Sequence, residues 1–303
     1  MNKYDVIVIG GGHAGVEAAV AAARRGAKTL LMTRAESDLG AMSCNPSVGG
    51  PGKSQMVAEI AALGGIMPHA ADAAGIHFRV LNATHGPATR ALRIQIDRDK
   101  YHKSITCHMS HITNLDIKFE PVESLDLQNK TVNGKYSASA IVITTGTFLR
   151  GLVHRGPEKI ESGRLQDDGT YQSPDTNISD VLRAAGFNLL RLKTGTPARI
   201  LADSVDFTKC EVQPGDAQFG DKNRVNCYIT HTTAETHKII RDNIASAPMY
   251  NGDIVGTGPR YCPSVEDKVM RFPEHETHHV FLEPETADGK IIYPNGISTS
   301  MPA

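Results

Sequence analysis

The sequence predicts an α/β fold with a Rossmann-like nucleotide-binding domain, and three observations near its start support this prediction. Residues 4–9 are a β-branched apolar run that is typical of a buried strand. A glycine turn at residues 10–15 leads into an alanine-rich stretch that predicts a helix ending near Arg25. Gly26 and a second apolar run at residues 27–33 complete a strand, turn, helix and strand.

The glycine turn has the pattern G-x-G-x-x-G, in which each glycine has a separate role. Gly10 permits the tight turn, Gly12 lets the backbone approach a pyrophosphate, and Gly15 allows the helix to pack against the strand. The helix then points its N-terminus at the anion. In this context we expect a dinucleotide to contact the whole turn, which consists of Gly10, Gly11, Gly12, His13, Ala14 and Gly15.

The end of the second predicted strand leaves the identity of the dinucleotide open. An acidic residue that binds a ribose belongs near position 33, but Thr33 and Arg34 stand there. Thr33 is a candidate cofactor contact, and Glu36 is close enough to take the acidic role. Arg34 would instead favour a 2′-phosphate, so that NADP is an alternative to FAD, unless this arginine is simply solvated.

Residues 125–149 favour a flavoprotein over a plain dehydrogenase. Two extended runs flank an Asn-Gly turn, and a long apolar strand follows and ends at residues 144–147. Such a β-meander returning to a parallel sheet is typical of a glutathione-reductase-like FAD-binding domain. Val122 is placed where a backbone can meet an adenine, although a core valine is equally compatible, and Gly146 is a further candidate contact.

The composition limits the remaining classes. A chain of 303 residues with 40% hydrophobic content can bury a sizeable core, and a net charge of −1 gives no global positive field. The start lacks an export signal and the most apolar helix is too short for a membrane span. Five cysteines without a C-x-x-C pair, and thirteen histidines without metal spacing, predict a cytoplasmic protein without a metal site.

Six segments together resemble the MnmG (GidA) family, the flavin subunits of a tRNA wobble-uridine modifying system. They are, in order, GGGHAG, SCNPSVGGPGK, LNATHGPATRALRIQIDRDKY, TTGTFLRG, RLKTGTPARI and GPRYCPSVEDKVMRFPE. The resemblance implies an enzyme that uses FAD, NADH and a folate-derived one-carbon donor. With the GTPase MnmE it would place an aminomethyl or carboxymethylaminomethyl group on carbon 5 of the uridine. It also implies a homodimer in the full-length family.

A related flavin- and folate-dependent methyltransferase family, TrmFO, shares the opening fold. The second cysteine motif and the long insertion favour MnmG. Two other functions stay open as alternatives. An NAD(P)H-dependent flavin oxidoreductase of the disulfide-reductase kind would need closely spaced cysteines, which this chain lacks. A non-catalytic nucleotide-binding module is the other alternative.

Two cysteines are the candidate catalytic residues, because the resemblance makes Cys44 and Cys262 the functional pair of the family. Cys44 lies in a loop that ends in Gly-Lys-Ser, but Ser47 and Pro51 break the phosphate-loop pattern. The loop glycines instead let the backbone pack against a flavin, and Asn45 is a candidate contact there. Lys53, Arg260 or a helix N-terminus are candidates for stabilising a thiolate. We expect the other three cysteines, Cys107, Cys210 and Cys227, to be structural.

By the same resemblance, residues 258–272 form an NADH-binding segment. Arg260, Lys268 and Arg271 would meet phosphates, whereas Glu266 and Asp267 would orient a ribose or the neighbouring thiol. A solvated charge cluster is the alternative. The remaining candidate contacts are Gly258, Tyr261, Pro263 and Ser264, together with Ser179, for which an N-cap role is the alternative.

A dense basic stretch suits a tRNA backbone, a solvated surface or a clamp on the flavin phosphates. It consists of Arg79, Arg90, Arg93, Arg98, Lys100 and Lys103. We predict a first part of the FAD-binding domain at residues 1–197, an inserted α+β subdomain at 198–259, and a truncated return to the FAD-binding domain at 260–303. The family's helical C-terminal domain would be absent. We therefore expect this chain alone to bind FAD weakly and not to modify tRNA.

Overall fold

The computed structural model describes residues 1–155, 158–163, 169–256, 258 and 263–302. Its first sheet has six strands in the order β6-β2-β1-β9-β8-β7, and the first four of these run parallel. Their bounds are β1 Asn2–Ile9, β2 Thr29–Thr33, β6 Leu115–Phe119, β7 Leu125–Asp126, β8 Thr131–Val132 and β9 Tyr136–Ile143. The predicted α/β class with a Rossmann-like sheet is confirmed.

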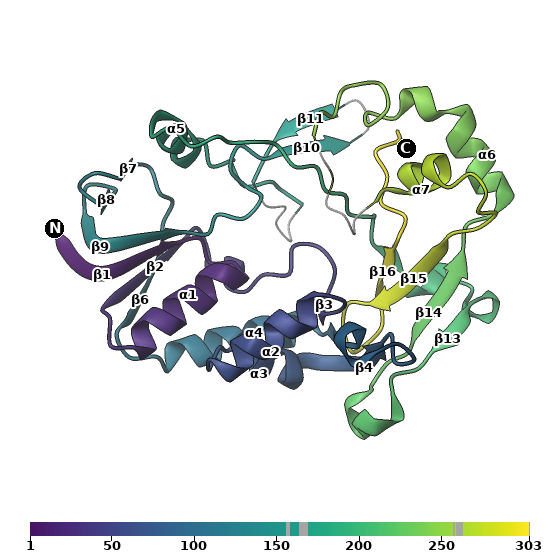
Figure 1. The fold of residues 1–303 in the computed structure, drawn as a ribbon, viewed down its shortest axis with the longest axis horizontal. Helices are drawn as coiled ribbons and strands as arrows, with labels where there is room; N and C mark the ends of the chain where they lie inside the picture. Colours follow the sequence, from purple (N-terminus) through teal and green to yellow (C-terminus); the bar gives the residue numbers. More distant parts are fainter. Residues whose placement is uncertain (156–157, 164–168, 257, 259–262, 303) are drawn as a thin grey trace.

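Helices cover one face of this sheet, as Figure 1 shows for α1 and α4. Helix α1 spans His13–Arg24, and its buried positions Val16, Ala19, Val20 and Ala23 recur at the helical spacing of three and four residues. Val16, Ala19 and Val20 pack with Val8 and Leu31 of the sheet and with Tyr101 and Ile105 of α4 in one core cluster. The other helices of this layer are α2 Lys53–Ala62, α3 Met67–Ala74 and α4 Arg98–Ser110.

Backbone geometry shows how one helix begins, and it confirms the predicted Asn-Gly turn. Asp97 caps α4, because its carboxylate accepts a hydrogen bond from the Lys100 amide at 3.1 Å. Asn133 and Gly134 both have positive φ, at 52° and 60°, as a two-residue hairpin turn requires. The turn joins β8 to β9, and β9 then runs beside β1 over its whole length, so the meander returns to the parallel sheet.

A three-stranded antiparallel sheet lies beside this layer, in the order β3-β5-β4. Gly49 in β3 lies so close to β5 that a Cβ would be 2.1 Å from the Leu92 carbonyl oxygen, and its φ is +91°. A glycine is therefore required here by both space and conformation. The bounds are β3 Ser47–Gly49, β4 Gly75–Leu81 and β5 Ala91–Ile96.

The second large sheet is antiparallel, in the order β12-β16-β15-β14-β13, and α6 and α7 pack beside it (Figure 1). It joins residues 200–201 to residues 291–295, so the predicted domain boundary after residue 259 lies inside one sheet. The domain limits themselves stay a prediction. The bounds are β12 Ile200–Leu201, β13 Glu211–Gln213, β14 Cys227–His231, β15 His279–Pro284, β16 Ile291–Asn295, α6 Ala234–Asp242 and α7 Val265–Arg271.

Short elements make up the rest. They are the hairpin β10 Leu152–Arg155 with β11 Glu158–Glu161, helix α5 Asn177–Ala184, and the 3₁₀ turns Glu36–Asp38, Pro87–Thr89, Ala202–Ser204, Phe207–Lys209, Ala217–Lys222 and Ile244–Ser246. Within the described ranges, no helix combines the length and apolar character that a bilayer crossing needs.

Candidate functional site

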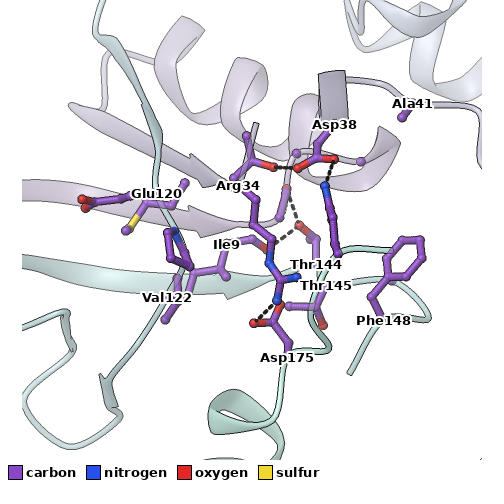
Figure 2. Close-up of a pocket in the computed structure, with 18 of the residues that line it drawn as sticks. Ile9, Arg34, Asp38, Ala41, Glu120, Val122, Thr144, Thr145, Phe148 and Asp175 are labelled. Atoms are coloured by element: carbon purple, nitrogen blue, oxygen red, sulfur yellow. Dashed lines mark hydrogen bonds and ion pairs between the residues drawn. The ribbon is translucent and has the colours of Figure 1, made fainter. Parts of the chain in front are cut away.

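A groove opens at the carboxyl ends of all four parallel strands, at the point where the chain order of the sheet reverses between β1 and β9 (Figure 2). It holds about 710 Å³ of space, part of it open to solvent. Ligands of open α/β sheets bind at this topological position. The lining residues used below are Gly10, Gly11, Gly12, Thr33, Arg34, Asp38, Ser43, Val122, Thr144, Gly146, Gln172 and Asp175.

The glycine turn forms the floor of this groove, and its three motif glycines have the predicted geometry. A Cβ on Gly15 would be 1.8 Å from the Gly10 carbonyl oxygen, and one on Gly10, whose φ is +104°, would be 2.5 Å from that of Thr144. Around Gly12, in contrast, no described atom lies within 4 Å of such a Cβ. The turn is therefore tightly packed underneath and open above Gly12.

The first turn of α1 leaves its backbone donors available. Among the described residues no side chain caps α1, and its first turn contains no acidic residue. The first amides of a helix have no intrahelical partner and attract an anion. His13 is packed on Tyr101, with 5.7 Å between ring centroids, and burial lowers its pKa, so its imidazole is neutral at physiological pH. Ala14 is exposed.

The end of β2 carries a polar chain that the sequence predicts only in part. The Thr33 hydroxyl donates to the Asp38 carboxylate at 3.2 Å, and the Gln172 amide donates to its other oxygen at 3.2 Å. Figure 2 shows Asp38 at the edge of the groove, whereas Glu36 is exposed and does not line it. The acidic side chain nearest the expected ribose position is therefore Asp38, which sequence spacing alone did not select.

Arg34 does not have the solvated role that was its simplest interpretation. Its guanidinium lies 2.8 Å from the Asp175 carboxylate, and it also donates to the Ser173 carbonyl oxygen. The two charged side chains are only 24% and 20% exposed. An arginine held in this way has part of its charge compensated, which weakens the case for a 2′-phosphate.

Val122 and Gly146 both lie at the groove. Val122 is 7% exposed and belongs to the core cluster under β1 and β9, so it is a core valine and a lining residue at once. Gly146 has a φ of +63°, which places the turn after β9 in the left-handed region. Both residues therefore lie on the predicted cofactor side.

Cys44 follows Ser43, which lines the groove, and its sulfur lies 3.5 Å from the Tyr293 hydroxyl on β16. Its carbonyl oxygen accepts hydrogen bonds from Arg98 and Arg199, each at 2.7 Å. Both guanidiniums also lie 3.0 Å from one Glu285 oxygen. The Cys44 loop is thus held by α4 and by the antiparallel sheet.

Two residues near Cys44 in the sequence do not have the contacts that were predicted for them. Asn45 is partly buried but does not line the groove. Lys53 is the first residue of α2, and in the described part of the chain the Cys44 sulfur contacts Tyr293 and not Lys53. Among the described residues, Arg98 and Arg199 donate to the Cys44 carbonyl oxygen, and they are 54 and 155 residues away in sequence. No local motif could have selected them.

The predicted NADH segment is only partly described. Cys262, Arg260 and Tyr261 lie outside the described residues. Gly258 packs against the Lys193 side chain, because a Cβ there would be 2.8 Å from Cε, and Pro263 is exposed.

Ser264 caps α7 by accepting from the Asp267 amide at 3.2 Å. Arg271 is 71% exposed and lies 3.6 Å from Asp267.

The alternative of a solvated charge cluster is wrong for the two acids of this segment. Glu266 is fully buried, and one of its oxygens accepts from the Ser300 amide at 2.7 Å and the Thr299 hydroxyl at 2.8 Å. Asp267 is 6% exposed and lies 3.2 Å from Lys193. The Lys268 ammonium donates to the Gly296 carbonyl oxygen at 2.7 Å. These groups hold neighbouring segments together, and the described ones do not line the groove.

Ser179 is not the N-cap of α5, because Thr176 holds that position. Ser179 is 2% exposed, its hydroxyl donates to the Thr176 carbonyl oxygen at 2.7 Å, and it accepts from Arg150 at 2.9 Å. It does not line the groove. Its hydroxyl is thus already in use inside the protein.

The basic stretch does not form one surface patch. Arg93 is bonded to the buried Glu283, Arg98 is paired with Glu285, and Arg79 donates to Gln213 at 2.6 Å. Only Arg90, Lys100 and Lys103 present exposed side chains. Three of its members are therefore not simply solvated, because they connect the antiparallel sheet of β3, β4 and β5, or helix α4, to the second large sheet. Contact of the stretch with tRNA stays a prediction.

The other cysteines are separated from each other. Cys107 is exposed on α4, Cys210 is partly buried, and Cys227 is fully buried, which raises the pKa of its thiol. In the described part of the chain no group of three or more histidine, cysteine or acidic side chains is arranged to hold a metal ion.

Comparison with known proteins gives the family. The model of the family described as glucose inhibited division protein A matches residues 5–303. The structure of Aquifex aeolicus GidA in its form I crystal is 44% identical, with a TM-score of 0.88 over 99% of this chain and 53% of that one. The structure of the same protein in its form II crystal is 42% identical, with a TM-score of 0.86 over 99% of this chain and 51% of that one. The chain thus spans about half the length of these relatives, and it belongs to the glucose inhibited division protein A (GidA) family.

Proposed function

We propose that this chain is the FAD-binding part of a flavin-dependent enzyme that modifies carbon 5 of the tRNA wobble uridine. The single observation that carries the proposal is the open groove above Gly12, which lies at the ends of four parallel strands and next to the Cys44 loop. Family membership supports the tRNA substrate. NADH, a folate-derived one-carbon donor, the GTPase MnmE, a homodimer and a cytoplasmic location belong to the same proposal.

The groove fits FAD in three respects. Its floor is a glycine turn over which nothing protrudes at Gly12. Uncapped amides at the start of α1 would bind the pyrophosphate. The backbone at Val122 would meet the adenine, and Asp38 would accept a hydrogen bond from a ribose hydroxyl. When bound, FAD would supply electron transfer.

Cys44 would provide the nucleophile, either toward the pyrimidine ring or to protect an intermediate. Its residue is exposed, so a substrate can reach the sulfur. Arg98 and Arg199 share the Glu285 carboxylate beside the Cys44 loop. Arg98 and Arg199 would also fix the position of the loop through the Cys44 carbonyl.

The proposal is tested by titrating the purified chain with FAD and following the quenching of flavin fluorescence. We expect saturable binding in the micromolar range and no stoichiometric flavin after purification. NADP⁺, titrated by isothermal titration calorimetry, should bind at least tenfold more weakly than FAD measured by the same method, because Asp175 already pairs with Arg34. No saturation by 100 μM FAD, or a preference for NADP⁺, would overturn the assignment.

The tRNA step is tested separately. The chain is incubated with tRNA, NADH, a folate donor and MnmE, and nucleosides are then analysed by mass spectrometry. For this chain alone we expect no modified uridine, and a version with the length of the Aquifex relatives should form it. In that longer version Cys44→Ser should abolish the product and keep FAD binding. Product formed by the Cys44→Ser variant would remove Cys44 from the mechanism.

A further inference from the structure

A second cavity lies between the three-stranded sheet and the second large sheet, and none of its described lining residues belongs to the groove. It holds about 520 Å³ of space, part of it open to solvent, which is a usual size for a small-molecule site. We propose that this cavity binds a small organic carboxylate, whose charged end pairs with Arg79 and whose apolar body packs on Phe281. The inference goes beyond the proposed function, because it involves neither FAD nor tRNA.

The lining residues divide into a buried set and a partly exposed set. Cys227, Gln95 and His77 are 0%, 2% and 4% exposed, so they form the closed end of the cavity. Arg79 and Phe281 are partly exposed and lie nearer to solvent. A ligand that enters past these two side chains would therefore keep its charged end at the mouth and place its body inside.

Hydrogen bonds across the cavity fix the spacing of the two sheets. From β4, the His77 ring nitrogen Nε2 lies 3.0 Å from the Gln213 carbonyl oxygen on β13. From β5, the Gln95 amide donates to the Pro284 carbonyl oxygen on β15 at 3.0 Å. Both bonds are buried, so the space between the sheets is preformed. A ligand would not have to separate the sheets in order to bind, which lowers the cost of binding.

Arg79 carries a positive charge that forms no ion pair with a described carboxylate. Its Nη1 donates to the Gln213 side-chain oxygen at 2.6 Å and to the Pro214 carbonyl oxygen at 3.5 Å, and both acceptors are neutral. Gln213 in turn donates to the exposed Glu211 at 2.6 Å, so this carboxylate lies behind the amide and is screened by solvent. Nε and Nη2 of Arg79 have no acceptor among the described residues, and they are available to a ligand carboxylate.

Arg93, the other cation of the lining, already has a carboxylate partner. It is bonded to Glu283, and its guanidinium carbon lies 5.7 Å from the centre of the Phe281 ring. Glu283 is fully buried, and burial raises its pKa to about 7, so at neutral pH it offsets at most the charge of Arg93. The charge of Arg79 therefore remains for one anionic group. A carboxylate matches it, whereas a phosphate dianion would bring a negative charge without a partner into a partly buried site.

The rest of the lining is neutral and suits an apolar body. Phe281 and Leu81 provide aromatic and aliphatic surface. Burial lowers the pKa of His77 and raises the pKa of the Cys227 thiol, so both groups stay uncharged at pH 7. Burial of an apolar body between these side chains would supply affinity, and the pair with Arg79 would set the orientation of the ligand.

The test is a titration of the purified chain with 4-fluorobenzoate, followed by fluorine NMR of the ligand. This acid has one negative charge on a flat apolar body, and we expect saturable binding with a Kd of about 1 mM. Arg79→Gln removes the charge and keeps an amide, and loss of the charge-assisted pair should weaken binding about tenfold. Unchanged affinity in this variant, or no saturation by about 20 mM acid, would overturn the proposal.

The matched control is Arg90→Gln, because Arg90 is exposed and does not line the cavity. It should bind the acid like the unmodified chain, and a loss equal to that in Arg79→Gln would show that a general change of surface charge is the cause.

Two further variants locate the site without depending on Arg79. Leu81→Trp fills part of the cavity from a partly exposed position, so it should weaken binding at least about fivefold. Gly12→Asp alters the groove and not the cavity, so affinity for the acid should stay unchanged. Binding that Leu81→Trp leaves intact, or that Gly12→Asp weakens, would place the acid elsewhere and contradict the proposal.

Two further ligands test the chemistry of recognition. The neutral 4-fluorobenzamide has the same shape and should bind about tenfold more weakly, and 4-fluorophenyl phosphate should bind no more tightly than the acid. Equal binding of the amide, or tighter binding of the phosphate, would overturn the assignment to a carboxylate. Every titration uses the chain without FAD, so a failure of FAD binding would refute the proposed function and leave this result standing.

Discussion

The glycine turn at residues 10–15 and the segment at residues 258–272, of which residues 258 and 263–272 are described, were both predicted to bind a nucleotide. They differ in where their polar groups point. The turn directs backbone amides into open space above Gly12. The segment uses its acids inside the protein, Glu266 on the chain at residues 299–300 and Asp267 on Lys193. Backbone N–H groups without a partner, more than charged side chains, therefore distinguish a ligand-binding surface from a segment that stabilises the fold.

The largest expected effect is a loss of unfolding free energy when the buried pair of Lys193 and Asp267 is broken. Lys193→Met leaves the buried Asp267 carboxylate without its closest cation, and removal of one partner from a buried pair should cost about 3 kcal/mol of unfolding free energy. Urea denaturation measures this change. FAD affinity should stay unchanged, since Lys193 does not line the groove.

The matched control is Lys159→Met, because Lys159 pairs with Asp253 at 2.7 Å but the two side chains are 45% and 41% exposed. Its cost should stay below about 1 kcal/mol. If the two variants lose the same unfolding free energy, the buried pair of Asp267 and Lys193 does not stabilise the fold more than an exposed pair does.

The next largest effect concerns the turn. Gly12→Asp places a carboxylate where the pyrophosphate would lie, and repulsion between like charges near a surface should reduce FAD affinity about 100-fold. Stability should be unaffected, because the backbone at Gly12 has a φ of −66° and nothing described lies within 4 Å of the new Cβ. Fluorescence titration with FAD and thermal denaturation measure the two quantities.

Gly86→Asp is the control for this variant, since Gly86 has a φ of −60°, has the same open surroundings, and lies outside the groove lining. It should bind FAD like the unmodified chain. Tight FAD binding by Gly12→Asp would place the pyrophosphate elsewhere.

A smaller effect depends on pH and belongs to the turn. Burial lowers the pKa of His13 below its unfolded value near 6.5. Between these two pKa values the unfolded chain binds more protons, so His13 reduces stability as pH falls through 6.5. The unmodified chain should therefore lose about 1 kcal/mol more than His13→Gln between pH 7.5 and pH 5.5. Urea denaturation at both pH values gives the difference.

The exposed His85 supplies the comparison variant, His85→Gln, for which no such difference is expected. If His13→Gln and the unmodified chain lose the same stability in acid, the imidazole is not kept neutral by the fold.

The smallest expected effect is a change in NADH affinity at Arg271, in the segment at residues 258–272. Arg271 is 71% exposed, so Arg271→Ala should change stability by less than about 0.5 kcal/mol. If its guanidinium meets a phosphate of NADH, as we propose, NADH affinity should fall about threefold. Arg241→Ala, at the exposed end of α6, is the control. Unchanged NADH affinity in Arg271→Ala would remove this residue from the NADH site.

Local structure was predictable from sequence, because its causes lie within a few residues. The helix after the glycine turn, the cap at Asp97 and the positive φ of Asn133 and Gly134 each follow from side-chain chemistry at the same positions. The groove itself was predictable too, since its floor is the motif.

The partners of charged groups were not predictable, because they are distant in the chain. Arg93 meets Glu283 across 190 residues, and Cys44 meets Tyr293 across 249. Burial then decides the role of the carboxylate, since a buried charge needs a partner of opposite charge. Asp38 was missed for a related reason: a 3₁₀ turn at residues 36–38 brings it back toward β2, and spacing along an extended chain does not show this.

The Cys44 loop is held by residues that are made late in synthesis, so the groove and this loop become ordered at different times. The strands and turn that form the groove are complete once residue 146 has left the ribosome. The partners of the Cys44 loop, Arg199, Glu285 and Tyr293, come later. A nascent chain would thus form the groove well before the Cys44 loop has its partners, which are complete only when nearly all of these 303 residues are made.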